Sequence, residues 1–232
     1  MTLGRVVALA RYPVKSLRGE QLDRLEFDDR GVTGDRWWAV RTAAGKFGSG
    51  KNTRRFTRLP HLLELSARLH GLAEPIVTLP DGAEHKAGDP ALDAAMSRLV
   101  GEPVTVTPEA DIPHLDAGAV HLVTTASLRW LATRLDRPDL AWTRTRANIV
   151  LDTPGDGRPE DDWSGRRLRI GGTTLEVLGG AVRCVMVGQA QGNLPEIPRL
   201  LPTLAGHDLT FGVYARVVEA GVVTEGDPVL AR

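Results

Sequence analysis

Residues 167–189 read RLRIGGTTLEVLGGAVRCVMVGQ, a series of short apolar runs separated by glycine pairs. Short runs rich in valine, isoleucine and threonine that are bounded by glycine are typical of β-strands joined by turns. We therefore predict three strands here, over Arg167–Ile170, Thr173–Leu178 and Val182–Gln189. This pattern places the chain in the mainly β class.

The same pattern extends over the rest of the chain, where 25 glycines and 15 prolines break the sequence into short elements. A helix is predicted over Asp89–Val100, because Asp89 is a natural N-cap and Gly101 a natural stop. A second helix is expected to begin near Thr125. The other predicted strands are Gly4–Tyr12, Gln21–Phe27, Arg36–Thr42, Leu62–Leu69, Pro75–Leu79, Arg146–Asp152, Leu209–Glu219 and Pro228–Ala231. The fold class is therefore expected to be mainly β (α+β), with barrel-like sheets and a few peripheral helices.

A loop-like stretch over residues 111–118 follows the first helix. We place a domain boundary there, which divides the chain into residues 1–110 and residues 111–232.

The composition argues against several classes of function. The 232 residues carry 29 basic and 29 acidic side chains, so no overall field favours nucleic acid or a membrane surface. The apolar N-terminal stretch ends at Arg11, too soon to cross a bilayer, and we expect no signal peptide. A single cysteine without a signal peptide predicts a cytoplasmic protein.

Cys184 is the only cysteine of the chain. One thiol forms no internal disulfide, and alone it cannot build a zinc or iron–sulfur cage. Three roles remain open for it: an inert core thiol, a nucleophile, or one thiolate ligand of a metal that is held mainly by another group.

Residues 45–53 (GKFGSGKNT) nearly match a phosphate-binding loop. However, Asn52 stands where the magnesium-binding hydroxyl should be, and Pro60 interrupts the helix that should follow. We interpret the segment as a glycine-rich hairpin rim. By default the basic residues beside it form a solvated face, with anion capture as the less favoured alternative; they are Lys51, Arg54, Arg55 and Arg58.

The six histidines show no metal-ligand spacing, so a catalytic zinc site is not expected. The tripeptide His114-Leu115-Asp116 is either an imidazole oriented by a carboxylate or a polar surface turn. Several other polar residues stand in distinct local settings, and their types suit a phosphate-bearing cofactor with a polar edge. These residues are Lys15, Ser16, Arg36, Arg146, Asn148 and Arg183.

Seven motifs in order along the chain resemble the MOSC superfamily, the molybdenum cofactor sulfurase C-terminal domain, together with its N-terminal β-barrel companion. They are residues 12–19 (YPVKSLRG), 31–38 (GVTGDRWW), 121–128 (HLVTTASL), 146–150 (RANIV), 160–163 (EDDW), 183–184 (RC), and 211–216 (FGVYAR) continuing to 226–229 (GDPV). The resemblance implies a β-barrel-like domain over residues 1–110, packed on a MOSC β-barrel over residues 111–232.

The chain is most similar to the amidoxime-reducing branch of this superfamily. That resemblance implies a molybdenum–molybdopterin cofactor, with Cys184 as both the metal ligand and the catalytic residue. The residues implied to bind the cofactor are Lys15, Ser16, Arg36, Thr124, Thr125, Arg146, Asn148, Arg183 and Tyr214. The implied reaction is two-electron reduction of an N–O bond in a small N-hydroxylated or N-oxide substrate. Its electrons would come from a separate flavin or iron–sulfur protein, because Cys184 alone cannot hold a cluster.

Two other functions stay open at this point. The protein could be a non-redox carrier that holds sulfur on Cys184 or passes on the molybdenum cofactor. It could also be a barrel without a cofactor that binds a small anion or another protein, because a fold alone does not fix a function.

Overall fold

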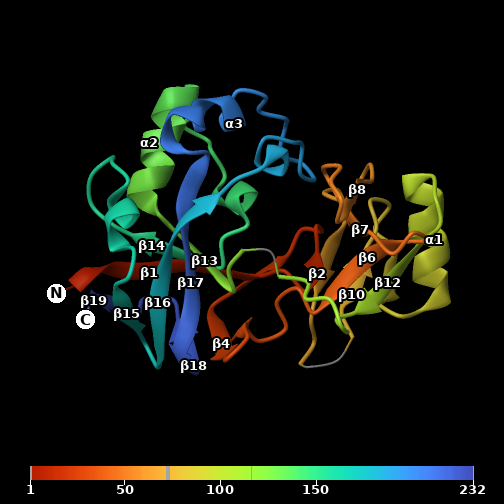
Figure 1. The fold of residues 1–232 in the computed structure, drawn as a ribbon, viewed down its shortest axis with the longest axis horizontal. Coiled ribbons are helices and arrows are strands. Elements are labelled where there is room, and N and C mark those ends of the chain that lie inside the picture. Colours follow the sequence, from red (N-terminus) through yellow and green to blue (C-terminus); the bar gives the residue numbers. More distant parts are fainter. Residues whose placement is uncertain (1, 72–73, 116, 232) are drawn as a thin grey trace.

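The structure, a computed structural model, describes residues 2–71, 74–115 and 117–231. Its larger part is a closed β-barrel (Figure 1). The ring closes because β1 pairs with β14 on one side and with β19 on the other. Neighbouring strands are antiparallel, except for the parallel pair β13 and β14. In order around the barrel the strands are β14 (Ile149–Asp152), β13 (Val120–Thr124), β17 (Thr210–Glu219), β16 (Thr173–Val182), β15 (Arg167–Ile170), β19 (Pro228–Ala231) and β1 (Thr2–Arg11).

Aliphatic side chains fill the barrel. Leu9, Leu122, Ile149, Leu168 and Leu175 are fully buried in one cluster. Burial of one such side chain stabilises a fold by about 1.5–3 kcal/mol, so this cluster is a major source of the free energy of folding.

The second part of the molecule is a five-stranded sheet beside the barrel. Its strands are β12 (Val104–Pro108), β6 (Trp38–Thr42), β7 (Phe47–Ser49), β8 (Phe56–Arg58) and the short β2 (Val14–Lys15), which runs parallel to β6. Helix α1 (Pro90–Val100) packs Leu92, Met96 and Val100 into the core of this part, at the end remote from the barrel (Figure 1). The Asp89 carboxylate caps the helix at the Ala91 amide, and Gly101 ends it in the left-handed conformation.

The remaining elements cover the edges of these two parts. One small sheet holds β9 (Ser66–Arg68), β10 (Ile76–Thr78) and β11 (Glu84–Lys86), and another holds β18 (Gly221–Thr224), β4 (Arg24–Asp28) and β5 (Gly31–Val32). Strand β3 (Glu20–Leu22) pairs antiparallel with the C-terminal end of β1. The other helical elements are α2 (Thr125–Leu135), α3 (Leu200–Thr203), η1 (Trp142–Thr145), η2 (Pro159–Trp163), η3 (Val185–Val187) and η4 (Ala205–His207). In the part of the chain that the structure describes, no helix is long and apolar enough to span a membrane.

The mainly β class and both predicted helices are confirmed. The strand predicted over Val182–Gln189 is wrong. Strand β16 instead continues through Gly179 and Gly180 to Val182, with register shifts at the glycines, and the chain then turns into η3. The glycines therefore form bulges within one strand and do not separate two strands. Strand β1 precedes residue 110 in sequence, yet it completes the barrel made by strands that follow residue 119.

Candidate functional site

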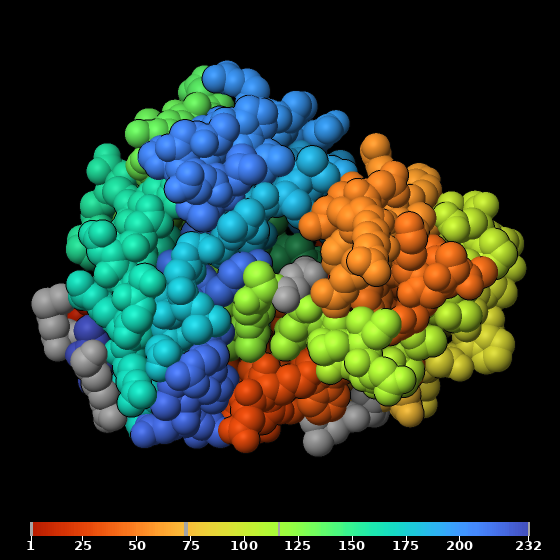
Figure 2. All heavy atoms as spheres, viewed as in Figure 1, coloured from red at the N-terminus to blue at the C-terminus, as the bar shows by residue number. Residues whose placement is uncertain are grey.

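A cavity of about 350 Å³ lies where the barrel meets the five-stranded sheet. In Figure 2 it is the hollow between the orange segment near residue 50 and the light-blue segment near residue 185. Both parts of the molecule therefore contribute to its walls. The lining residues are Lys15, Ser16, Arg36, Ser49, Lys51, Arg55, Phe56, Ala117, His121, Arg144, Thr145, Arg146, Val182, Arg183, Cys184, Met186, Val187 and Tyr214. We call this space the main cavity.

The main cavity is strongly cationic. Seven of its 18 lining residues are lysine or arginine, and none of the described lining residues is acidic. The Phe56 ring lies within cation–π distance of three of these charges, at 5.3 Å from Lys15 Nζ, 5.0 Å from Lys51 Nζ and 5.6 Å from the Arg55 guanidinium. Like charges gathered in this way repel one another, so the arrangement favours an anionic ligand.

Lys15, Ser16 and Arg36 are held on the side of the five-stranded sheet. Lys15 ends β2, and its ammonium donates to the His114 carbonyl at 2.7 Å. Ser16 and Arg36 have positive φ angles of 69° and 54°. The buried Asp35 carboxylate accepts the Tyr12 amide at 2.7 Å and pairs with the Arg36 guanidinium. These contacts hold Arg36 at the cavity wall.

Arg146, Arg183 and Cys184 line the main cavity from the barrel side. Arg146 caps η1 with a φ of 56°, and burial together with the nearby Arg36 lowers the pKa of its guanidinium to about 10. Strand β16 ends at Val182, so strand alternation no longer applies and Arg183 and Cys184 both reach the cavity. The Arg183 guanidinium donates to the Thr145 carbonyl at 2.6 Å. Cys184 is partly exposed.

Backbone strain is concentrated at the main cavity. Among the described residues, seven that are not glycine have positive φ, and three of these, Ser16, Arg36 and Arg146, line this cavity. Such a conformation costs about 1–3 kcal/mol per residue and is commonly kept at functional sites.

Two histidines next to these groups are neutral at pH 7. Burial, reinforced by the charge of Arg183, lowers the pKa of His121 well below its usual value. Its Nε2 lies 3.1 Å from the Phe211 carbonyl, and its ring contacts Tyr214. Burial also lowers the pKa of His114 to about 4, against the opposing effect of Glu109. The sequence left His114 open as a surface turn or a paired imidazole; it is buried, and Asp116 lies outside the described residues.

The structure brings seven of the ten predicted site residues to the main cavity and places three elsewhere. The Thr124 hydroxyl caps α2 and donates to Glu160 at 2.7 Å. The Thr125 hydroxyl donates to Asp152 at 2.9 Å. Asn148 bridges the His121 amide and the Ala10 carbonyl. In this structure these three side chains serve the local fold.

Sequence reasoning missed three cationic residues of the main cavity. Lys51 and Arg55 come from the basic cluster whose default interpretation was a solvated face, and the only available signal was the density of charge beside Phe56. Arg144 gave no signal, because its role depends on contacts with the distant Gln189 and Pro195 carbonyls. The predicted hairpin rim is confirmed, because residues 47–49 form β7 and no helix follows within residues 50–60.

The donor set fits an anionic cofactor that brings its own metal. Among the described residues, no group accepts a hydrogen bond from the buried Nε of Arg183, which lines the main cavity. A buried donor without an acceptor costs about 1–3 kcal/mol, which a bound acceptor would recover. No group of three or more His, Cys, Asp or Glu in the described chain could hold a metal ion alone. Cys184 could therefore serve as one thiolate ligand to a metal that is held mainly by a cofactor.

The fold and this site define a protein of barrel and sheet, with a cationic cavity between them that contains the single thiol. A family model described as the MOSC domain matches residues 101–230, and one described as the MOSC N-terminal beta barrel domain matches residues 3–95. The chain belongs to the MOSC domain family.

The chain was compared in fold with solved structures. The YUAD protein from Bacillus subtilis is similar over 99% of this chain and 94% of its own, with a TM-score of 0.55 and 18% identity. YiiM from Escherichia coli matches over 98% of this chain and 69% of its own, with a TM-score of 0.47 and 11% identity. The first likeness supports the fold alone. No curated protein matches the chain significantly.

Proposed function

We propose that this protein is a molybdenum cofactor-dependent reductase of small N-hydroxylated compounds, supplied with electrons by a separate flavin or iron–sulfur protein in the cytoplasm. One observation carries the proposal: the thiol of Cys184 lies in a cavity where all seven charged residues described are cationic. MOSC domains are associated with binding of this cofactor.

The residues of the chain divide into two roles in this proposal. Lys15, Arg36, Arg146 and Arg183 would hold the phosphate and the polar edge of the pterin through charged hydrogen bonds, with the Ser16 and Tyr214 hydroxyls beside them. The Cys184 thiolate would be the protein ligand to molybdenum. When bound, the cofactor supplies the redox-active metal, and the protein orients it and its substrate.

The net reaction is R–NH–OH plus two electrons and two protons, giving R–NH₂ and water. These 232 residues contain one cysteine and cannot hold an iron–sulfur centre, so in this proposal the centre that delivers the electrons belongs to a separate protein. His121 lines the main cavity and is neutral at pH 7, because burial lowers its pKa. It can therefore keep its contact with Tyr214 without adding another positive charge.

The experiment is reduction of a hydroxylamine or an amidoxime by protein made in a host that synthesises the cofactor, with reduced methyl viologen as the electron source. Wild type is compared with Cys184→Ala and with Val185→Ala, an exposed neighbour outside the cavity lining. We expect the first variant to lose activity at least 100-fold and the second to keep it. Full activity of Cys184→Ala would refute the ligand assignment. An inactive, metal-loaded wild type would refute the reductase and favour a carrier.

A further inference from the structure

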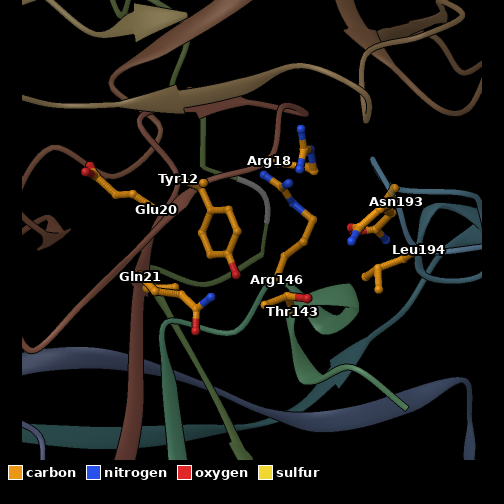
Figure 3. Close-up of a pocket in the computed structure, with 11 residues that line it drawn as sticks. Tyr12, Arg18, Glu20, Gln21, Thr143, Arg146, Asn193 and Leu194 are labelled. Carbon is orange, nitrogen blue, oxygen red and sulfur yellow. The ribbon is translucent and has the colours of Figure 1, made fainter. Parts of the chain in front are cut away.

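A second cavity, of about 210 Å³, lies on the other side of Arg146. Tyr12 stands in its wall, with the Arg146 guanidinium 4.4 Å and the Arg36 guanidinium 5.1 Å from its ring. Figure 3 shows the Arg18 and Arg146 guanidinium groups converging at one end of this cavity, with the Asn193 side chain beside them. The proposed reductase function does not use this space.

The converging charges are fixed in place by the backbone. Arg146 donates to the Leu17 carbonyl, one residue from Arg18, and Arg18 donates to the Glu64 carbonyl at 2.8 Å. Gly192 has a φ of 58°, and a Cβ there would lie 2.6 Å from Arg18 Nη1. Glycine adopts this left-handed φ without strain, and it lets the 191–194 turn lie close to the guanidinium. Two like charges are thus brought together at one end of a cavity.

The protein does not meet the hydrogen-bonding capacity of these two groups. Among the described residues, the buried Nε of Arg18 and the buried Nη2 of Arg146 have no acceptor. Among the lining residues that the structure describes, Glu20 is the only acidic one, and its carboxylate already accepts the Arg11 Nε and the Leu69 amide, both at 2.9 Å. The net charge of the cavity therefore remains positive.

We propose that the second cavity binds a small oxyanion, a carboxylate or a phosphate, between Arg18 and Arg146. Guanidinium groups match the geometry of such oxygens, and the neutral side chains of Asn193 and Thr143 at the same cavity can add hydrogen bonds. The small volume favours a ligand of a few carbon atoms or an inorganic ion. This inference holds whether or not Cys184 binds molybdenum.

The test is calorimetric titration of the full-length, cofactor-free protein with inorganic phosphate and with succinate, and with neutral succinamide as the chemical control. Wild type is compared with Arg18→Gln and with Lys51→Gln, which removes a charge from the main cavity alone. We expect a binding component that Arg18→Gln weakens at least about tenfold, the loss typical of one charged hydrogen bond, and that Lys51→Gln leaves within twofold. The preferred probe then tells whether the ligand is a phosphate or a carboxylate.

A second variant keeps the proposal testable if Arg18→Gln does not fold. Asn193→Asp changes one exposed side chain at the rim and adds a negative charge facing the two arginines. This variant should weaken the binding of both anions to a similar extent, and its thermal unfolding in anion-free buffer should be unchanged. Binding that is lost only in Lys51→Gln, equal binding of succinamide, or no binding of either anion would overturn the proposal.

Discussion

The interior of the barrel and the main cavity are both built partly from β16, and they differ in polarity and in backbone conformation. Along β16, Leu175 and Val177 are buried among aliphatic side chains, while Arg183 and Cys184, just beyond the end of the strand, face a cluster of cations. Aliphatic and aromatic side chains form the barrel cluster, whereas the main cavity is lined by like charges and by three residues with left-handed backbone. Stability thus resides in the barrel, and the main cavity is maintained at a cost in free energy, as expected for a ligand site.

The largest predicted effect concerns two leucines of β16. Leu175 is fully buried in the barrel, and Leu178 on the same strand is 47% exposed. Leu175→Ala should lower the free energy of unfolding by about 2–5 kcal/mol, because it leaves a cavity in a packed core. Leu178→Ala should change it by less than about 0.5 kcal/mol. Denaturant unfolding measures both, and equal losses would contradict the contrast drawn between the two regions.

Acidification should lower the free energy of unfolding through the buried histidines beside the main cavity. The pKa of His114 is about 4 in the folded protein against 6.5 when unfolded, so the unfolded chain binds more protons between these values. The stability that depends on a neutral His114 is therefore fully present above pH 6.5. It is lost as the pH falls toward 4, and this residue accounts for a loss of roughly 3 kcal/mol in the free energy of unfolding. His121, whose pKa is also lowered, acts in the same direction.

Denaturant unfolding of wild type and His114→Gln at a series of pH values checks this origin. The variant should lose less stability than wild type between pH 6.5 and pH 4, because it no longer carries the buried imidazole. Parallel stability curves for the two proteins would show that His114 is not responsible.

A smaller effect is expected on cofactor retention. Arg183→Gln should weaken binding of the molybdenum cofactor by about 1.5–3 kcal/mol, through loss of a charged hydrogen bond, and leave the unfolding of the cofactor-free protein within about 1 kcal/mol. Arg167→Gln, on the exposed side of β15, is the control. Fluorescence of the pterin that remains after dialysis measures retention. If both variants retain the cofactor as wild type does, Arg183 has no role in holding it.

The smallest effect should come from the balanced charges on the barrel surface. Glu176 and Arg216 form an exposed ion pair at 2.9 Å between β16 and β17. Glu176→Gln should change the free energy of unfolding by less than about 1 kcal/mol, and less still in 1 M salt. Thermal unfolding at two salt concentrations gives the difference. A large, salt-insensitive loss would mean that surface pairs contribute more than the contrast with the cavity allows.

Local patterns in the sequence were sufficient for both long helices and several strands, and insufficient for the assembly of the elements. Asp89 and Gly101 mark α1 because capping depends on neighbouring residues. Closure of the barrel by β1 and β14 joins residues about 140 positions apart, and no local pattern encodes such a pairing. The apolar run after Val182 was predicted as a strand, although Val182 and Val185 are both exposed and the chain turns into η3.

In the site, too, residue types were predictable from the sequence and contacts between distant residues were not. Lys15, Arg36, Arg146, Arg183 and Cys184 reach one cavity as their residue types and the family resemblance suggested. Residue type alone could not show that Thr124, Thr125 and Asn148 are engaged with Glu160, Asp152 and Ala10, because those partners are distant in sequence. Residue type alone also could not show that Lys51 and Arg55 line the main cavity.

The most direct measurement is the molybdenum and pterin content of wild type and Cys184→Ala, both purified from a host that makes the cofactor. Elemental mass spectrometry gives the metal, and fluorescence of the released pterin gives the organic part. We predict near-stoichiometric molybdenum and pterin in wild type and loss of the metal in the variant, with the fold intact by circular dichroism. Absence of both from wild type, or full metal in Cys184→Ala, would contradict the assignment of this cavity to a molybdenum cofactor bound through Cys184.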